Sequence, residues 1–334
     1  MKLQSFLCLF FLSVVCSSCL TKNDYNKLPD KPRNILPPST GNVSELVLII
    51  SDKLWAGKVG GVIREAFQES IKAVPQQEAL FDIYNIEANE FSAIFKTHKN
   101  ILYLSALEEP SFERKDERWA KDQLYVNLSN KTEDALLNIL KARIYTIRSW
   151  FLEKDRQRRL EKLIISAEKK TQKHLKKSFS LNATIPKGYQ VATEEKNFIW
   201  LRRDSPKRNV ISNIWVYSEA YYNADQFNLE QLIHLRDSIG KEYVEGVRPQ
   251  SFMATERLYS PHYNLVTKTP YTIETRGLWT MVNDFLGGAY VANAFLDDKK
   301  ERFFYVEGFI YCPAERKRSH IHELETVLYS LSSN

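Results

Sequence analysis

The stretch TEDALLNILKARIYTIRSWFLEKDRQRRLEKLIISAEKKTQKHLKK, residues Thr132 to Lys177, is the longest helical pattern in the chain. It contains no Gly or Pro, and its first acidic residues suit the positive end of a helix dipole. Apolar residues recur at helical spacing at Leu136, Leu140, Ile144, Ile147, Phe151, Leu160, Ile164 and Ala167. The pattern predicts one long helix that separates two regions with strand patterns of their own.

The face opposite this stripe is basic. Residues Lys141 to Lys177 hold thirteen Lys or Arg against four Asp or Glu, a surplus larger than the net charge of +6 of the whole chain. Such a face can meet phosphate, an anionic lipid surface or an acidic partner. It can equally be a solvated helix surface, because exposed Lys and Arg need no partner.

Before the long helix, residues 44–177 predict an N-terminal α/β domain that ends in it. The apolar run ELVLIIS at Glu45 predicts a buried strand, and apolar spacing predicts a helix after it over residues 51–71. Further strands are expected over 81–86, 101–104 and 124–128, with a short helix over 89–95 and a charged loop between the last two strands.

After the long helix, residues 178–334 predict a C-terminal α+β domain with an antiparallel sheet. Strands are expected over 198–202, 210–217, 271–278, 290–296 and 302–311, and helices over 227–239 and 320–331. The fold class of the chain is therefore α+β. The order of elements in this second region loosely resembles the fold shared by the PsbP-type photosystem proteins and the Mog1-type Ran-binding proteins.

The first nineteen residues, MKLQSFLCLFFLSVVCSSC, have the layout of an export signal. Lys2 precedes an apolar run that is too short to span a bilayer. Two small residues then stand before Cys19, as in a bacterial lipobox. We therefore expect a signal peptide over 1–18, lipidation of Cys19 and a Pro-rich tether over 19–43. Acyl chains on Cys19 would anchor the protein to the envelope membrane, and an outer membrane location facing the periplasm is favoured.

The cysteine count excludes a disulfide framework in the mature protein. Cys8 and Cys16 leave with the signal and Cys19 is lipidated, so Cys312 remains alone. Its apolar neighbours indicate a buried small hydrophobe. None of the six histidines has a known metal-ligand spacing, and no cofactor motif is present, so neither metal nor cofactor is expected. Export makes nucleic acid an unlikely partner.

Several short motifs resemble a domain-of-unknown-function family of Gram-negative cell-envelope lipoproteins. WAGKVGGVIREAF at Trp55, LIHLRDSIGKEYVEG at Leu232 and RGLWTMVNDFLGGAYV at Arg276 carry the resemblance. RGLW with NDFLGG is its most specific part, although Ala289 stands where the family would have proline. The resemblance implies lipidation at Cys19 and an envelope location, and it carries no known activity or catalytic residue.

The residues that best suit a ligand surround the RGLW and NDFLGG motifs. Paired glycines let a ligand approach the backbone, and polar and aromatic side chains beside them can hold it. The candidate binding residues are Arg236, Asp237, Arg276, Trp279, Asn283, Asp284, Gly287 and Gly288. The alternative interpretation is structural: Arg276 or Arg236 pairs with a carboxylate to hold the loop, and the glycines supply a tight turn.

The sequence predicts a binding protein of the envelope, with an unidentified protein or glycan as its partner, and it shows no catalytic spacing. Two alternatives remain open. One is a hydrolase acting on envelope material, with Asp284 and a neighbouring acid or His as its acid and base. The other is a small-ligand carrier that uses the loop from Arg276 to Gly288.

Overall fold

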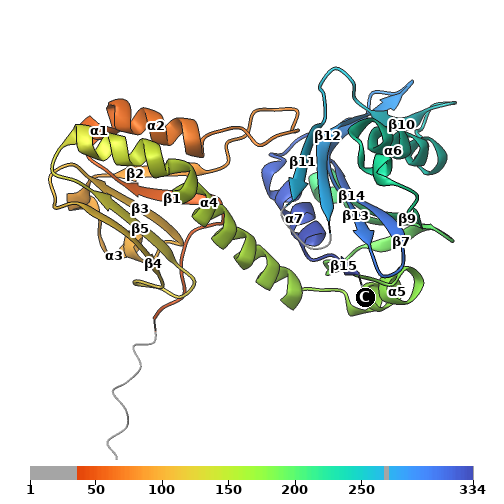
Figure 1. Ribbon diagram of the computed structural model, residues 1–334, viewed down its shortest axis with the longest axis horizontal. Coiled ribbons are helices and arrows are strands. Elements are labelled where there is room, and N and C mark those ends of the chain that lie inside the picture. The colour runs from red at the N-terminus through yellow and green to blue at the C-terminus, as the bar shows by residue number, and fades with distance from the viewer. Residues whose placement is uncertain (1–35, 267–270, 334) are drawn as a thin grey trace, which may run out of the picture. The chain divides into compact units, whose positions relative to one another are not determined.

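The computed structural model describes residues 36–266 and 271–333 (Figure 1). Residues Pro37–Asn334 form one compact unit. The predicted signal peptide, Cys19 and most of the predicted tether lie outside the described residues. None of the helices in the described ranges is long and apolar enough to cross a membrane.

The first sheet has five strands in the order β2-β1-β3-β5-β4. They are β1 (Glu45–Ile49), β2 (Asp82–Ile86), β3 (Asn100–Ser105), β4 (Ser111–Asp116) and β5 (Leu124–Ser129). All neighbours are parallel except β4, which runs antiparallel to β5. The prediction of a loop between β3 and β5 was wrong, because part of that segment pairs as the edge strand β4. Its charged, mostly exposed residues suit an edge, where charge discourages pairing with other chains.

Helices cover both faces of this sheet. They are α1 (Asp52–Ala56), α2 (Lys58–Phe67), the short 3₁₀ helix η1 (Ala88–Glu90), α3 (Ala93–Lys96) and α4 (Glu133–Ile165). The expected helix over 51–71 is broken at Gly57, which ends α1 and begins α2. Ser51 caps α1 by accepting a hydrogen bond from the Leu54 N–H. Leu46 and Leu48 of β1 pack against α2 and α4 in one apolar core.

The predicted long helix is two helices, α4 (Glu133–Ile165) and α5 (Lys169–Phe179). The break has a tertiary cause. The Glu168 N–H donates to the Ile185 carbonyl at 2.8 Å, and the Lys187 N–H donates to the Ser166 carbonyl, so this segment pairs with another part of the chain. The expected stripe is buried as far as Phe151. Beyond it, Leu163 is buried and Ile164 is exposed, contrary to the prediction.

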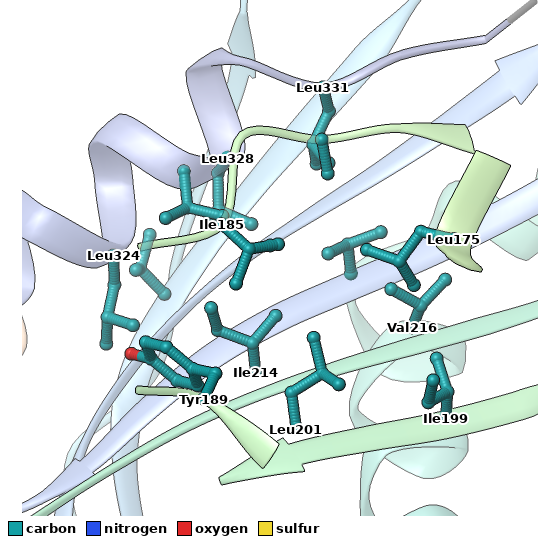
Figure 2. Close-up of a cluster of buried hydrophobic side chains, with 14 of the residues drawn as sticks. Leu175, Ile185, Tyr189, Ile199, Leu201, Ile214, Val216, Leu324, Leu328 and Leu331 are labelled. Carbon is teal, nitrogen blue, oxygen red and sulfur yellow. The ribbon is translucent and has the colours of Figure 1, made fainter. Parts of the chain in front are cut away.

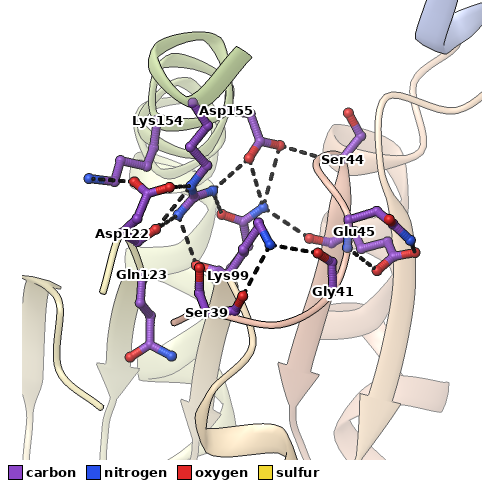
Figure 3. A network of polar contacts seen from close by, with 12 residues as sticks. Ser39, Gly41, Ser44, Glu45, Lys99, Asp122, Gln123, Lys154 and Asp155 are labelled. Carbon is purple, nitrogen blue, oxygen red and sulfur yellow. Dashed lines mark hydrogen bonds and ion pairs between the residues drawn. The ribbon is translucent and has the colours of Figure 1, made fainter. Parts of the chain in front are cut away.

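Polar residues take over the buried face of α4 after Phe151 (Figure 3). The Arg158 guanidinium, whose side chain is 4% exposed, donates to Asp155 Oδ1 at 2.6 Å and to Asn100 Oδ1 at 2.7 Å. It also donates to the Lys99 and Asp122 carbonyls. Asp155 Oδ2 accepts the Ser44 N–H at 2.6 Å. This network ties α4 to the chain entering β1 and β3.

The second sheet is antiparallel, in the order β10-β12-β13-β14-β9-β8-β7, with β11 also pairing with β12. Its strands are β7 (Gln190–Glu195), β8 (Phe198–Ser205), β9 (Val210–Ala220), β10 (Phe252–Thr255), β11 (His262–Val266), β12 (Thr272–Val282), β13 (Gly287–Asp297) and β14 (Arg302–Tyr311). The five predicted strands are confirmed. β7, β10 and β11, all at or near the edges, were not predicted. A small separate sheet pairs β6 (Leu181–Asn182) with β15 (Ser332–Ser333).

Helices lie on both faces of the second sheet as well. α7 (Arg318–Tyr329) covers one face, where Leu324 and Leu328 share one apolar core with Ile214 and Val216 of β9 (Figure 2). α6 (Leu229–Tyr243) covers the other, beside the aromatic side chains of β14. The short 3₁₀ helices η2 (Pro206–Arg208) and η3 (Ala224–Phe227) lie in connections. The structure confirms the α+β class and buries Cys312 in the α7 core, as expected. The division at residue 177 stays a prediction.

We expect Asp155→Ala to cost about 3–5 kcal/mol of unfolding free energy, because it removes the buried carboxylate partner of Arg158 and leaves this charge only the more exposed Asp122. Urea unfolding followed by circular dichroism measures this. Glu153→Ala is the matched control, because it removes an exposed partner of Arg156 on the same helix and should cost less than about 1 kcal/mol. Equal losses in the two variants would contradict the role assigned to Asp155.

Candidate functional site

Strand alternation places the candidate residues of β12 on opposite faces of the sheet. Arg276 lies on the α7 side, where its Nε donates to Glu274 Oε1 at 2.7 Å and its Nη1 to Glu325 Oε1 at 2.5 Å. The two carboxylates raise the pKa of the Arg276 guanidinium above its ordinary value, although burial opposes the rise. Arg276 therefore joins β12 to α7 through carboxylates, as the structural alternative describes.

Arg236 and Asp237 lie on α6, on the opposite side of the sheet. The Arg236 guanidinium is buried, donates to Glu307 Oε1 at 3.0 Å and lies 4.2 Å from the centre of the Tyr290 ring. Burial raises the pKa of the Glu307 carboxyl, and Arg236 opposes that rise. Asp237 accepts the Thr255 N–H at 2.7 Å. These contacts fasten α6 to the sheet.

Trp279 and the paired glycines form a compact arrangement at the end of the β12–β13 hairpin. The Trp279 indole N–H donates to the Ile310 carbonyl at 3.1 Å. A Cβ at Gly288 would lie 2.0 Å from that carbonyl oxygen and 2.8 Å from Trp279 Nε1, so the packing requires glycine there. A Cβ at Gly287 would lie 3.0 Å from the Trp279 carbonyl oxygen, a milder conflict.

Asn283 and Asp284 make the turn of this hairpin. Asn283 has φ of 60°, the left-handed conformation that asparagine tolerates, and its side-chain amide donates to the Gln250 carbonyl. Asp284 Oδ1 accepts the Phe285 N–H at 2.7 Å and lies 3.8 Å from Arg248 Nε. Among the described residues, no acid or histidine forms a hydrogen bond or ion pair with Asp284. Its contacts therefore do not supply the acid and base that the hydrolase alternative needs.

An open cleft of about 400 Å³ brings three of the predicted residues together: Trp279, Gly287 and Gly288. Tyr259, Phe285 and Lys317 line it as well. Asn283 and Asp284 lie beside it in the turn, whereas Arg236, Asp237 and Arg276 are not among its lining residues. The structure thus brings Trp279 and the paired glycines together at one cleft, and it places Arg236 and Arg276 elsewhere.

Sequence reasoning missed four exposed apolar side chains, which we call the apolar rim: Tyr259 and Phe285 line this cleft, and Leu258 and Val247 lie in the loops next to them. Exposed fractions are 91% for Val247, 85% for Leu258, 66% for Tyr259 and 86% for Phe285. Arg248 lies 4.5 Å from the centre of the Phe285 ring and connects two of these loops. A signal was present, because each rim residue lies in a polar, turn-rich connection, after α6, after β10 or after β12. Single apolar residues in loops are common and indicate nothing by themselves. They indicate a binding surface only because the fold brings these loops together.

One other group of side chains has a composition suited to metal binding. The ligand atoms of Cys312, Glu315 and His320 lie within 4.8 Å of one another, in the connection after β14 and the first turn of α7. Arg208 already binds Glu315 through two nitrogens. Burial also raises the pKa of the Cys312 thiol, which disfavours the thiolate that a metal needs. The set is therefore a weak metal candidate.

We expect Gly288→Ala to lower the melting temperature more than Gly287→Ala does. The added methyl group at position 288 meets a backbone oxygen and an indole ring that are both held by neighbouring strands. Differential scanning calorimetry of the two variants measures the difference. The account of this hairpin would be wrong if alanine were equally tolerated at both positions.

The buried His322 on α7 predicts a loss of stability in acid. Its pKa falls from 6.5 to about 4 because burial disfavours the imidazolium; Glu325 opposes this fall, and Arg159, Arg318 and Arg276 add to it. The unfolded chain therefore binds a proton between pH 6.5 and 4 that the folded chain does not, and stability decreases as the pH falls through this range. The full effect is about 3 kcal/mol.

Chemical unfolding at pH 4.5 and pH 7 tests this for His322→Gln, with His234→Gln on the exposed face of α6 as the control. The loss on acidification should be smaller in His322→Gln than in the wild type and unchanged in the control. An unchanged loss in both variants would contradict the prediction.

Comparison with known proteins gives two matches to families of unknown function. Residues 168–330 match the family model of a domain of unknown function, DUF4837, and residues 39–164 match that of another, DUF8532. No curated protein matches.

Two human solved structures show a distant likeness. The lipid transfer and protein localization domain of StarD13 has 11% identity and a TM-score of 0.22, covering 48% of this chain and 94% of that one. StAR-related lipid transfer protein 5 has 9% identity and a TM-score of 0.23, covering 52% and 93%. These scores are too low to carry an argument, and the likeness to PsbP and Mog1 proteins stays a prediction. The chain is thus similar, over most of its described length, to two adjoining domains of unknown function.

Proposed function

We propose that this chain is a lipid-anchored binding protein of the bacterial cell envelope. Acyl chains on Cys19 hold it to the membrane, on the periplasmic side of the outer membrane, and the apolar rim binds a protein partner. The lipobox-like sequence before Cys19 supports the anchor. The apolar rim is the observation that supports binding.

The chemistry of the rim favours a protein partner. Protein interfaces are enriched in aromatic residues and arginine, with apolar anchors at their centre. Tyr259 and Phe285 supply aromatic anchors, and Arg248 and Arg257 lie close by in the same loops.

Metabolic labelling with a palmitate analogue tests the anchor. The wild type should incorporate the label and fractionate with membranes, because the Cys19 thiol and the new amino terminus carry acyl chains. Cys19→Ser should lose the label. Unlabelled wild type, or a labelled Cys19→Ser variant, would contradict lipidation at this position.

Photo-crosslinking in cells tests the rim. A photoreactive amino acid at position 259 should yield a discrete crosslinked protein band at native expression, and Phe285→Ser should reduce its yield at least tenfold, because an apolar anchor is lost. Leu107→Ser is the control, since Leu107 is 93% exposed in the first half of the chain, outside the rim. A crosslink to glycan alone, or none, would overturn the proposed protein partner.

A further inference from the structure

Arg159 on α4 forms no ion pair with any of the residues that the structure describes. Its Nε and Nη1 atoms are buried, and within the described ranges they make no hydrogen bond. Its neighbour Arg158 contacts two carboxylates and two backbone carbonyls. Burial lowers the pKa of the Arg159 guanidinium, although Asp155 and Glu325 oppose the fall. An unpaired buried charge costs several kcal/mol, so such a group calls for a counter-ion.

The acids nearest to Arg159 are already committed to other groups. Asp155 binds Arg158 and the Ser44 N–H, and Glu325 binds Arg276. Glu323, which lies in the same cleft, pairs with Arg203. No carboxylate among the described residues forms an ion pair with Arg159, so its charge can meet a molecule from outside the chain.

Arg159 lines a cleft of about 450 Å³ bounded by α4, the turn after it and α7. Lys162, one turn along α4, lines the same cleft and has no ion pair with any of the residues described. Ser319, at the start of α7, adds a hydroxyl group, and Leu163 and Pro186 add apolar surface. The cleft thus combines Arg159 and the exposed Lys162 with a hydroxyl group and an apolar wall. The carboxylates of Asp122 and Glu323 also line it, and each is paired with an arginine, Arg158 and Arg203 respectively.

We propose that this cleft binds the phosphoryl group of a small phosphorylated ligand, with Arg159 and Lys162 as its cations and Ser319 as a hydroxyl donor. A guanidinium matches the geometry of phosphate oxygens, and an ammonium adds a point charge. The volume exceeds that of a free ion and is within the range of small-molecule sites, so the apolar wall accommodates an organic portion. This site is separate from the apolar rim and does not depend on the proposed partner there.

Thermal unfolding of the purified full chain in phosphate-free buffer tests the site. The probes are inorganic phosphate, glycerol 3-phosphate and dihexanoyl phosphatidic acid below its micelle concentration, each against sodium chloride of equal ionic strength. The melting temperature of the wild type should rise with at least one probe, because a ligand that binds only the folded state stabilises it. A rise with glycerol 3-phosphate assigns a soluble phosphomonoester, and a rise with phosphatidic acid alone assigns a lipid headgroup. No rise with any probe overturns the proposal.

Two variants separate binding from folding. Arg159→Met keeps the length of the side chain and removes its charge, so without probe it should melt at or above the wild-type temperature and should lose the rise with probe. Lys162→Gln should weaken the apparent affinity about tenfold, and Lys141→Gln, an exposed lysine of α4 outside the cleft, should leave it unchanged. A probe-dependent rise that persists in Arg159→Met, or equal effects of the two lysine variants, would contradict the site.

Discussion

The buried pair of Asp155 and Arg158 sets the position of α4, and the rest of the structure depends on that helix. Asp155 and Arg158 satisfy each other's charge and bind backbone groups at the start of β1 and β3. Because buried charges are costly unless every hydrogen-bonding group is used, this arrangement admits few alternatives. The first part of α4 completes the core of the first sheet, and Leu163 near its end joins the core under α7. One helix therefore contributes to two cores.

In the second sheet, too, buried ion pairs hold helices in place. Almost every residue of β14 is buried, since α7 covers one face of the strand and α6 the other. Arg276 of β12 donates to Glu325 of α7, and Arg236 of α6 donates to Glu307 of β14. The charged groups that looked most like ligand-binding residues are thus used to hold α6 and α7 in place. Two features take no part in these contacts: the apolar rim, and Arg159, whose Nε and Nη1 make no hydrogen bond within the described residues.

The candidate site was predictable in part, and the reason is geometric. The paired glycines and Trp279 are close in the hairpin, so a local motif was enough to group them. Arg276 is only three residues from Trp279, but an odd separation along a strand places the two side chains on opposite faces. Arg159 gave no signal, because a lysine- and arginine-rich helix face does not reveal which of its charges lacks a partner.

The sequence by itself determined the α+β class, the five central strands of the second sheet and the apolar stripe of α4 up to Phe151, because these depend on hydrophobic periodicity within short segments. Tertiary structure alone decided three further features: the break after Ile165, the edge strand β4 and the gathering of the rim loops. Each of these depends on backbone pairing or packing between segments far apart in the chain. The spacing of apolar residues within a short segment does not reveal contacts with distant segments.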